Sequence, residues 1–428
     1  MYALAAELFP IARSITGEGV RQTLKILQRE LPELTLKSVP SGTECFDWKV
    51  PPEWTIRDAY IVAPDGAKLA QFKSHNLHVV GYSEPVDRRI SLSQLQAHLH
   101  SLPEQPDAIP YVTSYYKRTW GFCLSDRERT ALQSGDYQVM IDSVLDEEGQ
   151  LDYGELVISA TVTDAPEILL STYVCHPSMA NNELSGPVVT TALAKWLAQL
   201  PERRFTYRIV FIPETIGAIV YLSRNLDHLK RAVVAGFNVS CVGDERTYSY
   251  LPTRHGDTIS DQIAQHVLEH KVGDYVRYSF LDRGSDERQY NAPGVDLPIA
   301  SLMRSKFGAY PEYHTSEDNL DLISSSGLQG GFDVLQLALI CLEANRTYRA
   351  TVLCEPQLSK YGLYPTARKK GDPKPKDLLN VLAYSDGRTS LLEIARRLDQ
   401  PLWQLARAAN TLTSAGLLEE CPPMESLV

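Results

Sequence analysis

The chain has 428 residues, of which 43% are hydrophobic and 22% are charged. This length corresponds to about three domains of roughly 150 residues each, and the composition is typical of a globular protein, which excludes disordered, collagen-like and coiled-coil chains. The formal net charge of −11 argues against general affinity for nucleic acid or for an anionic membrane surface, because both need clustered Lys and Arg.

The first 40 residues predict one helix and one strand. Apolar side chains at Leu24, Ile26 and Leu27 follow a helical spacing, and residues 34–39 alternate between apolar and polar as a strand does. Residues 41–160 then change to short β-rich segments between prolines and glycines, which predicts a separate, inserted β-rich domain. The strands expected there cover residues 59–62, 77–80, 137–141 and 156–160.

Between residues 161 and 350, strand-like and helix-like segments alternate. The apolar run 168–174 is typical of a buried central strand. The segments expected after it are a helix over 186–200, a strand over 209–212, a helix over 215–229 and a strand over 232–239. This alternation predicts an α/β domain with a mostly parallel sheet, formed by residues 1–40 and 161–350, with its functional side chains at the carboxyl ends of the strands.

Residues 370–428 predict a small C-terminal domain that resembles a winged helix. Residues 369–376 have the composition of a linker, and two amphipathic helices are expected over 391–398 and 402–412. The second of these helices carries a single basic residue, Arg407. We therefore do not expect this domain to bind nucleic acid, and we favour a structural or dimerising role.

Three features of the chain favour the cytoplasm. No apolar stretch approaches the ~20 residues of a membrane span. The N-terminus has no basic region ahead of an apolar stretch, as a signal peptide would have. The seven cysteines are odd in number and scattered, with no C-x-x-C pair, which fits a reducing compartment.

His176 is the first residue that points to chemistry. It follows the predicted central strand and begins a polar loop that leads into a helix. Ligands bind at such positions in α/β sheets, and imidazole is the commonest metal ligand. A loop histidine that only caps the helix is the alternative, which Glu183, seven residues further on, makes less favoured.

Glu214 is the second such residue, because it comes directly after the predicted strand 209–212. A buried carboxylate at a strand end has a raised pKa, which suits a general base that accepts a proton from a metal-bound water. A carboxylate that caps the following helix is the alternative.

His314 is the third, and it precedes a segment that predicts a capped helix. Its distance from His176 in the sequence is expected, because zinc sites in such sheets gather single ligands from several strand ends. The charged loop 282–288 lies between the two histidines. Arg283 in this loop could bind a substrate carboxylate and Asp286 could bind or support a metal, although a solvated turn fits the same residues.

The order of these motifs resembles the zinc aminopeptidases of the aminopeptidase S and glutamate carboxypeptidase type. Within this clan, the similarity is closest to the bacterial aminopeptidase-like proteins that carry an inserted β-rich domain and a C-terminal winged helix, and it covers essentially the whole chain. The motifs that carry it are Arg13–Gly19, Ser114–Tyr116 with Trp120–Cys123, Cys175–Ser178, Asn182–Gly186, Pro213–Gly217, Ser285 with Asp286, and His314. The resemblance implies a three-layer α/β zinc-peptidase-like domain, with residues 41–160 as the insert and residues 370–428 as the winged helix.

The resemblance also implies that this chain departs from the two-zinc site of the clan. The His-x-Asp motif has Ser178 in its third position, the metal-bridging Asp falls at Asn182, and the second Glu of the Glu-Glu pair falls at Thr215. Asn and Thr are poorer zinc ligands than a carboxylate. We therefore expect one zinc ion in preference to two.

The expected ligands are His176, Glu183 and His314, and Glu214 aligns with the general base of the clan. These residues imply a zinc-dependent amide or peptide hydrolase of the aminopeptidase-like type, in which Glu214 takes a proton from the attacking water and returns it to the departing amine. The expected substrate is a peptide or a small amide-containing metabolite. The alternative is a catalytically impaired scaffold, which binds a ligand through the peptidase fold and a partner through the winged helix.

Further residues are candidates for contact with the substrate or for support of the ligands. The sequence around Tyr115, Tyr116 and Arg118 is dense in aromatic and cationic side chains, as in a pocket wall with a carboxylate-binding arginine. An aromatic stripe of the core is the alternative, and the resemblance favours at least one of the tyrosines facing the site. Arg13, in a motif with two glycines, and Asn182 are the other candidates.

Overall fold

The computed structural model describes residues 1–363 and 373–421. Two compact units divide the chain. One unit contains Met1–Ser260 and Val276–Phe332, and the other contains Asp261–Tyr275 and the chain from Asp333 onward. All residues of the predicted catalytic site belong to the first unit.

An eight-stranded sheet organises the first unit, in the order β1-β10-β12-β11-β13-β16-β14-β15. These strands are β1 (Thr35–Pro40), β10 (Gln150–Ile158), β11 (Glu167–Tyr173), β12 (Thr206–Ile212), β13 (Val233–Asn238), β14 (Ser249–Leu251), β15 (Val276–Arg277) and β16 (Ile299–Met303). The central pairs β12-β11-β13-β16 are parallel, and β10 joins them antiparallel. Every residue of β11 is buried, as its continuous apolar run predicts.

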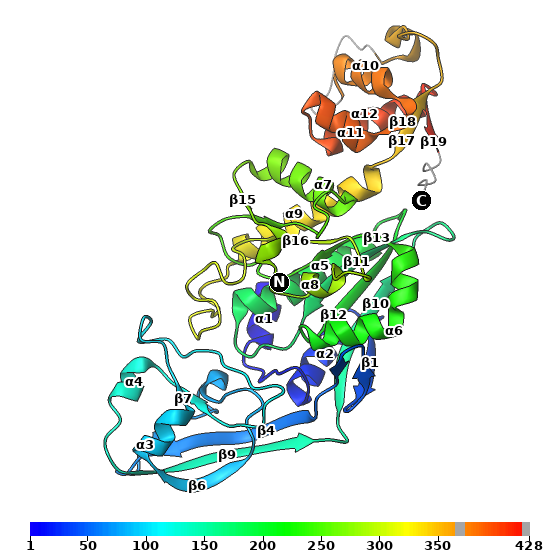
Figure 1. Ribbon diagram of the computed structural model, residues 1–428. Helices are drawn as coiled ribbons and strands as arrows, with labels where there is room; N and C mark the ends of the chain where they lie inside the picture. Colours follow the sequence, from blue (N-terminus) through cyan, green and yellow to red (C-terminus); the bar gives the residue numbers. More distant parts are fainter. Residues whose placement is uncertain (364–372, 422–428) are drawn as a thin grey trace. The chain divides into compact units, whose positions relative to one another are not determined.

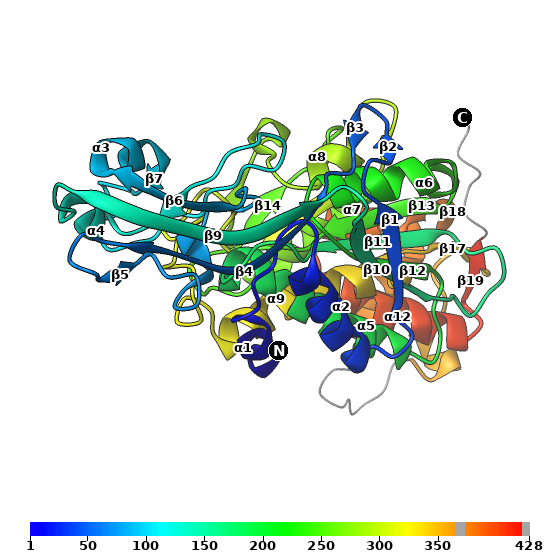
Figure 2. The same ribbon diagram turned by 90° about the horizontal axis from the view of Figure 1, so that it is seen from below.

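Helices cover both faces of this sheet, so the predicted α/β fold is confirmed. Figure 2 shows α2 and α5 on one side of the strands and α6 and α8 on the other. The first eight helices begin in this unit: α1 (Tyr2–Leu8), α2 (Glu18–Glu30), α3 (Leu92–Leu95), α4 (Asp126–Thr130), α5 (Ser185–Ala198), α6 (Ile216–Ala232), α7 (Ile259–Val267) and α8 (Glu287–Tyr290). Helix α5 is apolar on most of its surface and almost fully buried, as expected for a helix between the sheet and α1.

The insert is built on a four-stranded antiparallel sheet in the order β5-β4-β9-β6. Figure 1 shows β4 and β9 as the long strands of this sheet, with β6 beside β9. The strands of the insert are β2 (Glu44–Cys45), β3 (Trp48–Lys49), β4 (Glu53–Val62), β5 (Lys68–Leu69), β6 (Val86–Ser91), β7 (Leu99–His100), β8 (Phe122–Cys123) and β9 (Asp136–Asp146).

Two predictions for the insert are wrong. The strand expected over 77–80 is a 3₁₀ turn, Asn76–His78. The strand expected over 156–160 is the end of β10, which pairs with β1 and β12 in the large sheet, so the insert ends near Gly149 and not at 160. The insert also shares one continuous apolar core with the α/β domain. Strand propensity alone cannot tell which of two sheets a strand will join.

The second unit contains the winged helix, and its two predicted helices are confirmed as α11 (Leu391–Leu398) and α12 (Leu402–Ser414). Its other elements are α9 (Ser325–Ala344, which begins in the first unit), α10 (Pro375–Tyr384), β17 (Thr347–Ala350), β18 (Asp386–Ser390) and β19 (Leu418–Cys421). Strand β17 pairs with both β18 and β19, so the sheet of this domain begins well before the predicted boundary at residue 370. Residues 369–372 of the expected linker 369–376 lie outside the described residues. No helix in the described part of the chain is both long and apolar enough to cross a bilayer.

Candidate active site

Two neighbouring strand ends form the base of the candidate site. Strands β11 and β12 run parallel with Tyr173 opposite Ile212, and the loops that follow them carry His176 and Glu214. The register therefore brings these two side chains together, as the sequence predicts. Nε2 of His176 lies 3.6 Å from Oε2 of Glu214.

His314 approaches from the loop after β16. The ring centres of His314 and His176 lie 5.4 Å apart. The ring centre of Tyr111, from the insert, lies 5.1 Å from that of His314 and 5.2 Å from that of His176. The capped helix expected directly after His314 is absent from this described segment, because residues 315–322 form turns and the next helix begins at Ser325. In this segment the carboxylate of Asp318 accepts backbone N–H groups from residues 180–182.

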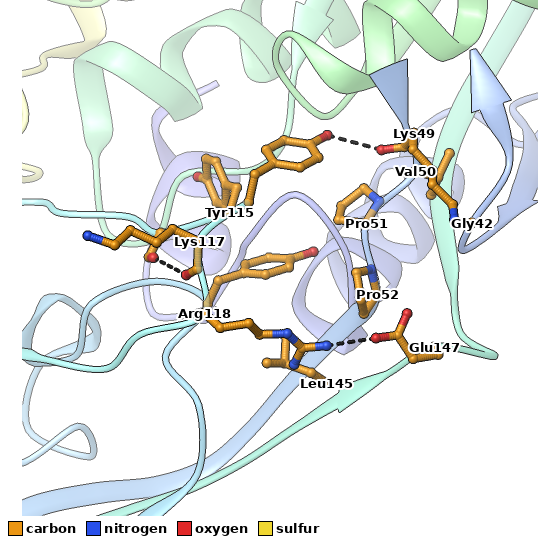
Figure 3. A pocket seen from close by; sticks show the side chains of 13 residues that line it. Gly42, Lys49, Val50, Pro51, Pro52, Tyr115, Lys117, Arg118, Leu145 and Glu147 are labelled. Carbon is orange, nitrogen blue, oxygen red and sulfur yellow. Dashed lines mark hydrogen bonds and ion pairs between the residues drawn. The ribbon is translucent and has the colours of Figure 1, made fainter. Parts of the chain in front are cut away.

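These side chains line a cavity of about 300 Å³. The lining residues are Ile15, Trp48, Tyr111, Thr113, Tyr115, Tyr116, Cys175, His176, Glu214, Thr215, Ile216, Arg288 and His314. The segment with Tyr115 and Tyr116 also lines a second cavity of about 250 Å³ on the side of the insert, which Figure 3 shows. Both tyrosines therefore contribute to the wall of the candidate site.

The buried ion pair of Glu183 and Arg13 contacts His176 and fixes its position. Its Nδ1 lies 2.9 Å from Oε2 of Glu183, and Nε of Arg13 lies 3.7 Å from the other carboxylate oxygen. Nε of Arg13 also donates to the carbonyl oxygen of His176, at 3.0 Å. Burial opposes the charged ring, but the hydrogen bond and the negative charge of Glu183 outweigh it and raise the pKa of His176. A carboxylate on Nδ1 leaves Nε2 free to face the cavity.

His314 has the opposite electrostatic environment. Burial, assisted by the nearby His176, lowers the pKa of His314 to about 3, so the ring is neutral at physiological pH. Its Nε2 is buried and has no hydrogen-bond partner among the described residues. A buried imidazole lone pair without a partner is a suitable donor for a cation.

His176, His314 and Glu214 line the same cavity and are the candidate donors for one cation, and 3.6 Å separates Nε2 of His176 from Oε2 of Glu214. Among the described residues, the group whose ligand atoms all lie within 4.8 Å of one another is a different one, Cys175, His176 and Glu183. That second group fits a metal poorly, because the carboxylate already binds the ring Nδ1 and the Arg13 cation stands beside it.

A second ion has no ligands of its own at Asn182 and Thr215, because both side chains make hydrogen bonds within the protein. Oδ1 of Asn182 accepts from the hydroxyl of Tyr173 at 3.1 Å. Oγ1 of Thr215 accepts from Nη2 of Arg288 at 2.7 Å, so a cationic side chain stands where a carboxylate ligand would be expected.

Thr215 occupies a strained turn next to Glu214. Its dihedrals are φ 63° and ψ −76°, and the amide of Ile216 donates to the carbonyl of Glu214 at 2.8 Å, which defines a γ-turn of the rare kind. Positive φ is unfavourable for a β-branched residue. Two groups hold the turn: Oδ1 of Asp286 accepts the Thr215 amide at 2.6 Å, and Arg288 binds its hydroxyl. Backbone strain of this kind is typical of functional sites.

We expect the variant Thr215→Gly to be more stable than Thr215→Ala by about 1–2 kcal/mol, because only Ala keeps a Cβ in the left-handed region. Both variants lose the hydroxyl, so their difference reports the backbone alone. In an ordinary helix or strand the order is reversed, by about 0.5–1 kcal/mol. Free energies of unfolding from denaturant titration measure the difference, and an Ala variant as stable as the Gly variant would show that the strain is absent.

Three consecutive residues, Ser285, Asp286 and Glu287, set the surroundings of Glu214. Oγ of Ser285 donates to Oε1 of Glu214 at 2.6 Å, which fixes one carboxylate oxygen. Burial and then the charge of Glu214 raise the pKa of Asp286 well above its usual range. Burial also raises the pKa of Glu287, whose Oε1 accepts two backbone N–H groups. Asp286 binds the backbone amide of Thr215 and is not among the residues that line the cavity.

Several predicted residues lie away from the cavity. Arg13, Glu183 and Asn182 are buried behind it. Arg118 lines the second cavity, where it pairs with Glu147 at 2.7 Å. Arg283 is exposed and stacks on the ring of Phe280 at 5.0 Å, so the prediction that it binds the substrate has no support from its position.

Sequence reasoning did not single out Arg288, Tyr111 or Trp48, which line the cavity. Arg288 belongs to the charged loop already singled out, but nothing in a run of charges shows which member turns inward. Tyr111 and Trp48 come from the insert, and long-range contacts bring Tyr111 to the site, among them the hydrogen bond from the Tyr111 amide to the His314 carbonyl, at 2.8 Å.

Comparison with known proteins supports this architecture. Residues 2–345 match the family model described as a domain of unknown function, DUF4910, and residues 346–420 match a winged helix-turn-helix model. A Clostridium acetobutylicum protein is 44% identical over 423 residues, which cover 98% of this chain and 96% of that protein. Its provisional name describes a polysaccharide biosynthesis protein with an aminopeptidase-like domain.

Solved structures are similar over the same extent. The crystal structure of a provisionally named peptidase from Clostridium acetobutylicum is 43% identical, with a TM-score of 0.91 over 98% of this chain and 95% of that one. The zinc aminopeptidase BSAP from Bacillus subtilis has a TM-score of 0.59 at 12% identity, over 79% of this chain and 93% of that one. An M28 peptidase precursor from Shewanella amazonensis has a TM-score of 0.58 at 14% identity, over 83% and 94%. The last two show a shared fold.

Proposed function

This chain belongs to the DUF4910 family of aminopeptidase-like proteins with a C-terminal winged helix, and we propose that it is a zinc-dependent amide hydrolase that works at the cavity described above. The observation that carries the proposal is the convergence of His176, Glu214 and His314 in one cavity at the carboxyl ends of the parallel strands. The fold shared with zinc aminopeptidases supports it.

In this proposal His176 and His314 hold a single zinc ion. Glu183 takes a different role from the predicted one, because its carboxylate binds the far nitrogen of the His176 ring and so orients the ligand. When bound there, zinc would supply Lewis acidity to the amide carbonyl and to water.

Glu214 acts as the general base. Ser285 fixes its Oε1, so Oε2 is the oxygen that faces Nε2 of His176 and the space where a substrate would sit. Oε2 accepts a proton from the attacking water as the new C–O bond forms, and it delivers that proton to the nitrogen as the C–N bond breaks. The products are a carboxylic acid and an amine.

In this proposal the other residues that line the cavity bind the substrate. The aromatic rings of Tyr111, Tyr115 and Tyr116 enclose one side of the cavity and would exclude bulk water from a bound amide. The substrate class in this proposal is a peptide or a small amide-containing metabolite. We also propose a cytoplasmic location, which the seven free cysteines support, and a structural or dimerising role for the winged helix.

The ligand assignment is tested by zinc content. We expect His176→Ala and His314→Ala each to lose most of the bound zinc, because each removes one of the two imidazole donors. The matched control is His255→Ala, which changes an exposed histidine outside the cavity and should keep full zinc content. Elemental analysis and a melting curve on each preparation give the result, and full zinc content in either folded site variant would overturn the assignment.

A further inference from the structure

Arg288 is the one lysine or arginine among the described residues that line the cavity. It lies on α8, directly after the two buried acids Asp286 and Glu287, and its guanidinium reaches across to Thr215, beside Glu214. The side chain is exposed toward the cavity, unlike the acids that precede it. A positive charge is therefore placed next to the proposed general base.

The guanidinium of Arg288 makes few polar contacts with the described part of the protein. Its one hydrogen bond to a described residue is the bond from Nη2 to the Thr215 hydroxyl, and no described carboxylate oxygen lies within 4.0 Å of it. Arg118 in the neighbouring cavity shows the contrast, because Glu147 neutralises it there (Figure 3). Most of the five N–H donors of Arg288 thus remain available to a ligand.

An arginine with available donors in a cavity selects for a carboxylate, which it binds through two parallel hydrogen bonds. An ammonium group, such as the free N-terminus of a peptide, would be repelled by the same charge. Trp48 and Tyr116, which line the same cavity, meet edge to face with ring centres 5.5 Å apart, which suits an apolar or aromatic group.

We propose that the cavity recognises an amide that carries a carboxylate close to the scissile bond, as in an N-acylated amino acid, and that Arg288 binds this carboxylate. The hydrolysis of such a substrate rests on the proposed function, whereas the preference for a carboxylate can be tested independently of any reaction. It separates this chain from an enzyme that acts on free peptide N-termini, because Arg288 offers a cation to the group beside the amide, while Glu214, the anion that lines the same cavity, is held by Ser285 as the proposed base.

The test measures binding and needs no hydrolysis. The probes are 3-phenylpropanoate and 3-phenylpropanol, which share the aromatic group and chain and differ in the carboxylate. Calorimetry on the full-length chain should show 3-phenylpropanoate binding about 10- to 100-fold more tightly, the range expected for a hydrogen-bonded charge pair. Arg288→Gln should abolish this preference and leave the affinity for 3-phenylpropanol within about twofold.

Two further variants sharpen the result. Arg288→Lys should keep part of the preference, because it retains the charge without the paired donors. Arg283→Gln is the matched control from the same loop and should behave as wild type, since Arg283 lies outside the cavity.

The proposal is overturned if wild type binds both probes equally, or fails to bind 3-phenylpropanoate at millimolar concentration. It is also overturned if the preference survives Arg288→Gln, which would place the carboxylate elsewhere, for example on the metal. Failure of the proposed hydrolysis would leave these binding results unaffected, so the two proposals fail separately.

Discussion

Glu214→Gln is expected to lower the turnover of amide hydrolysis by about 10²–10⁴-fold, the usual contribution of a general base. Gln keeps the size and hydrogen-bonding shape of Glu but cannot accept the proton of the attacking water. The hydrogen bond from Ser285 can persist, because the amide oxygen of Gln also accepts. Zinc content should stay unchanged, since the proposed ligands are His176 and His314.

Zinc content and hydrolysis rate, measured on one Glu214→Gln preparation, separate three roles. A general base loses activity and keeps zinc. A metal ligand loses both, which the 3.6 Å between Glu214 and Nε2 of His176 makes a real alternative. A residue that only caps α6 loses neither, and unchanged activity would remove Glu214 from the mechanism.

Arg13→Ala is expected to reduce the free energy of unfolding by about 3–5 kcal/mol, because it leaves the fully buried carboxylate of Glu183 without its cation. The effect should be large because neither side chain has access to water. Denaturant titration of the metal-free chain measures it without a contribution from zinc binding.

Two comparisons show whether the buried charge is the cause. The double variant Arg13→Met with Glu183→Leu removes both charges and should recover much of the lost stability. Arg29→Ala breaks an exposed pair with Glu7 and should leave the midpoint of unfolding almost unchanged. A loss in Arg13→Ala as small as that in Arg29→Ala would contradict this account of the pair.

The central part of the site could be predicted because it depends on local patterns. Residues 168–174 and 209–212 are apolar runs that end in polar loops, and parallel pairing of β11 with β12 necessarily brings His176 close to Glu214. The two winged-helix helices were equally clear, because their apolar positions repeat with a helical period.

The parts that failed depend on long-range contacts. The segment after His314 has the composition of a capped helix, but its Asp318 accepts hydrogen bonds from the backbone of residues 180–182, far away in the sequence. β10 has ordinary strand propensity, and only its pairing with β1 and β12 shows that it leaves the insert. Arg283 and Arg288 are indistinguishable in a run of charges, although one faces solvent and the other lines the cavity.

The most direct test of the central claim is the zinc stoichiometry of the full-length protein after metal-replete purification, measured together with amide hydrolysis on the same preparation. We expect one zinc ion per chain, and hydrolysis that is lost with a chelator and restored by zinc. Two ions per chain would contradict the conclusion drawn from Asn182 and Thr215, whose side chains bind Tyr173 and Arg288. A preparation without zinc, or one whose hydrolysis is indifferent to zinc, would contradict the proposed function itself.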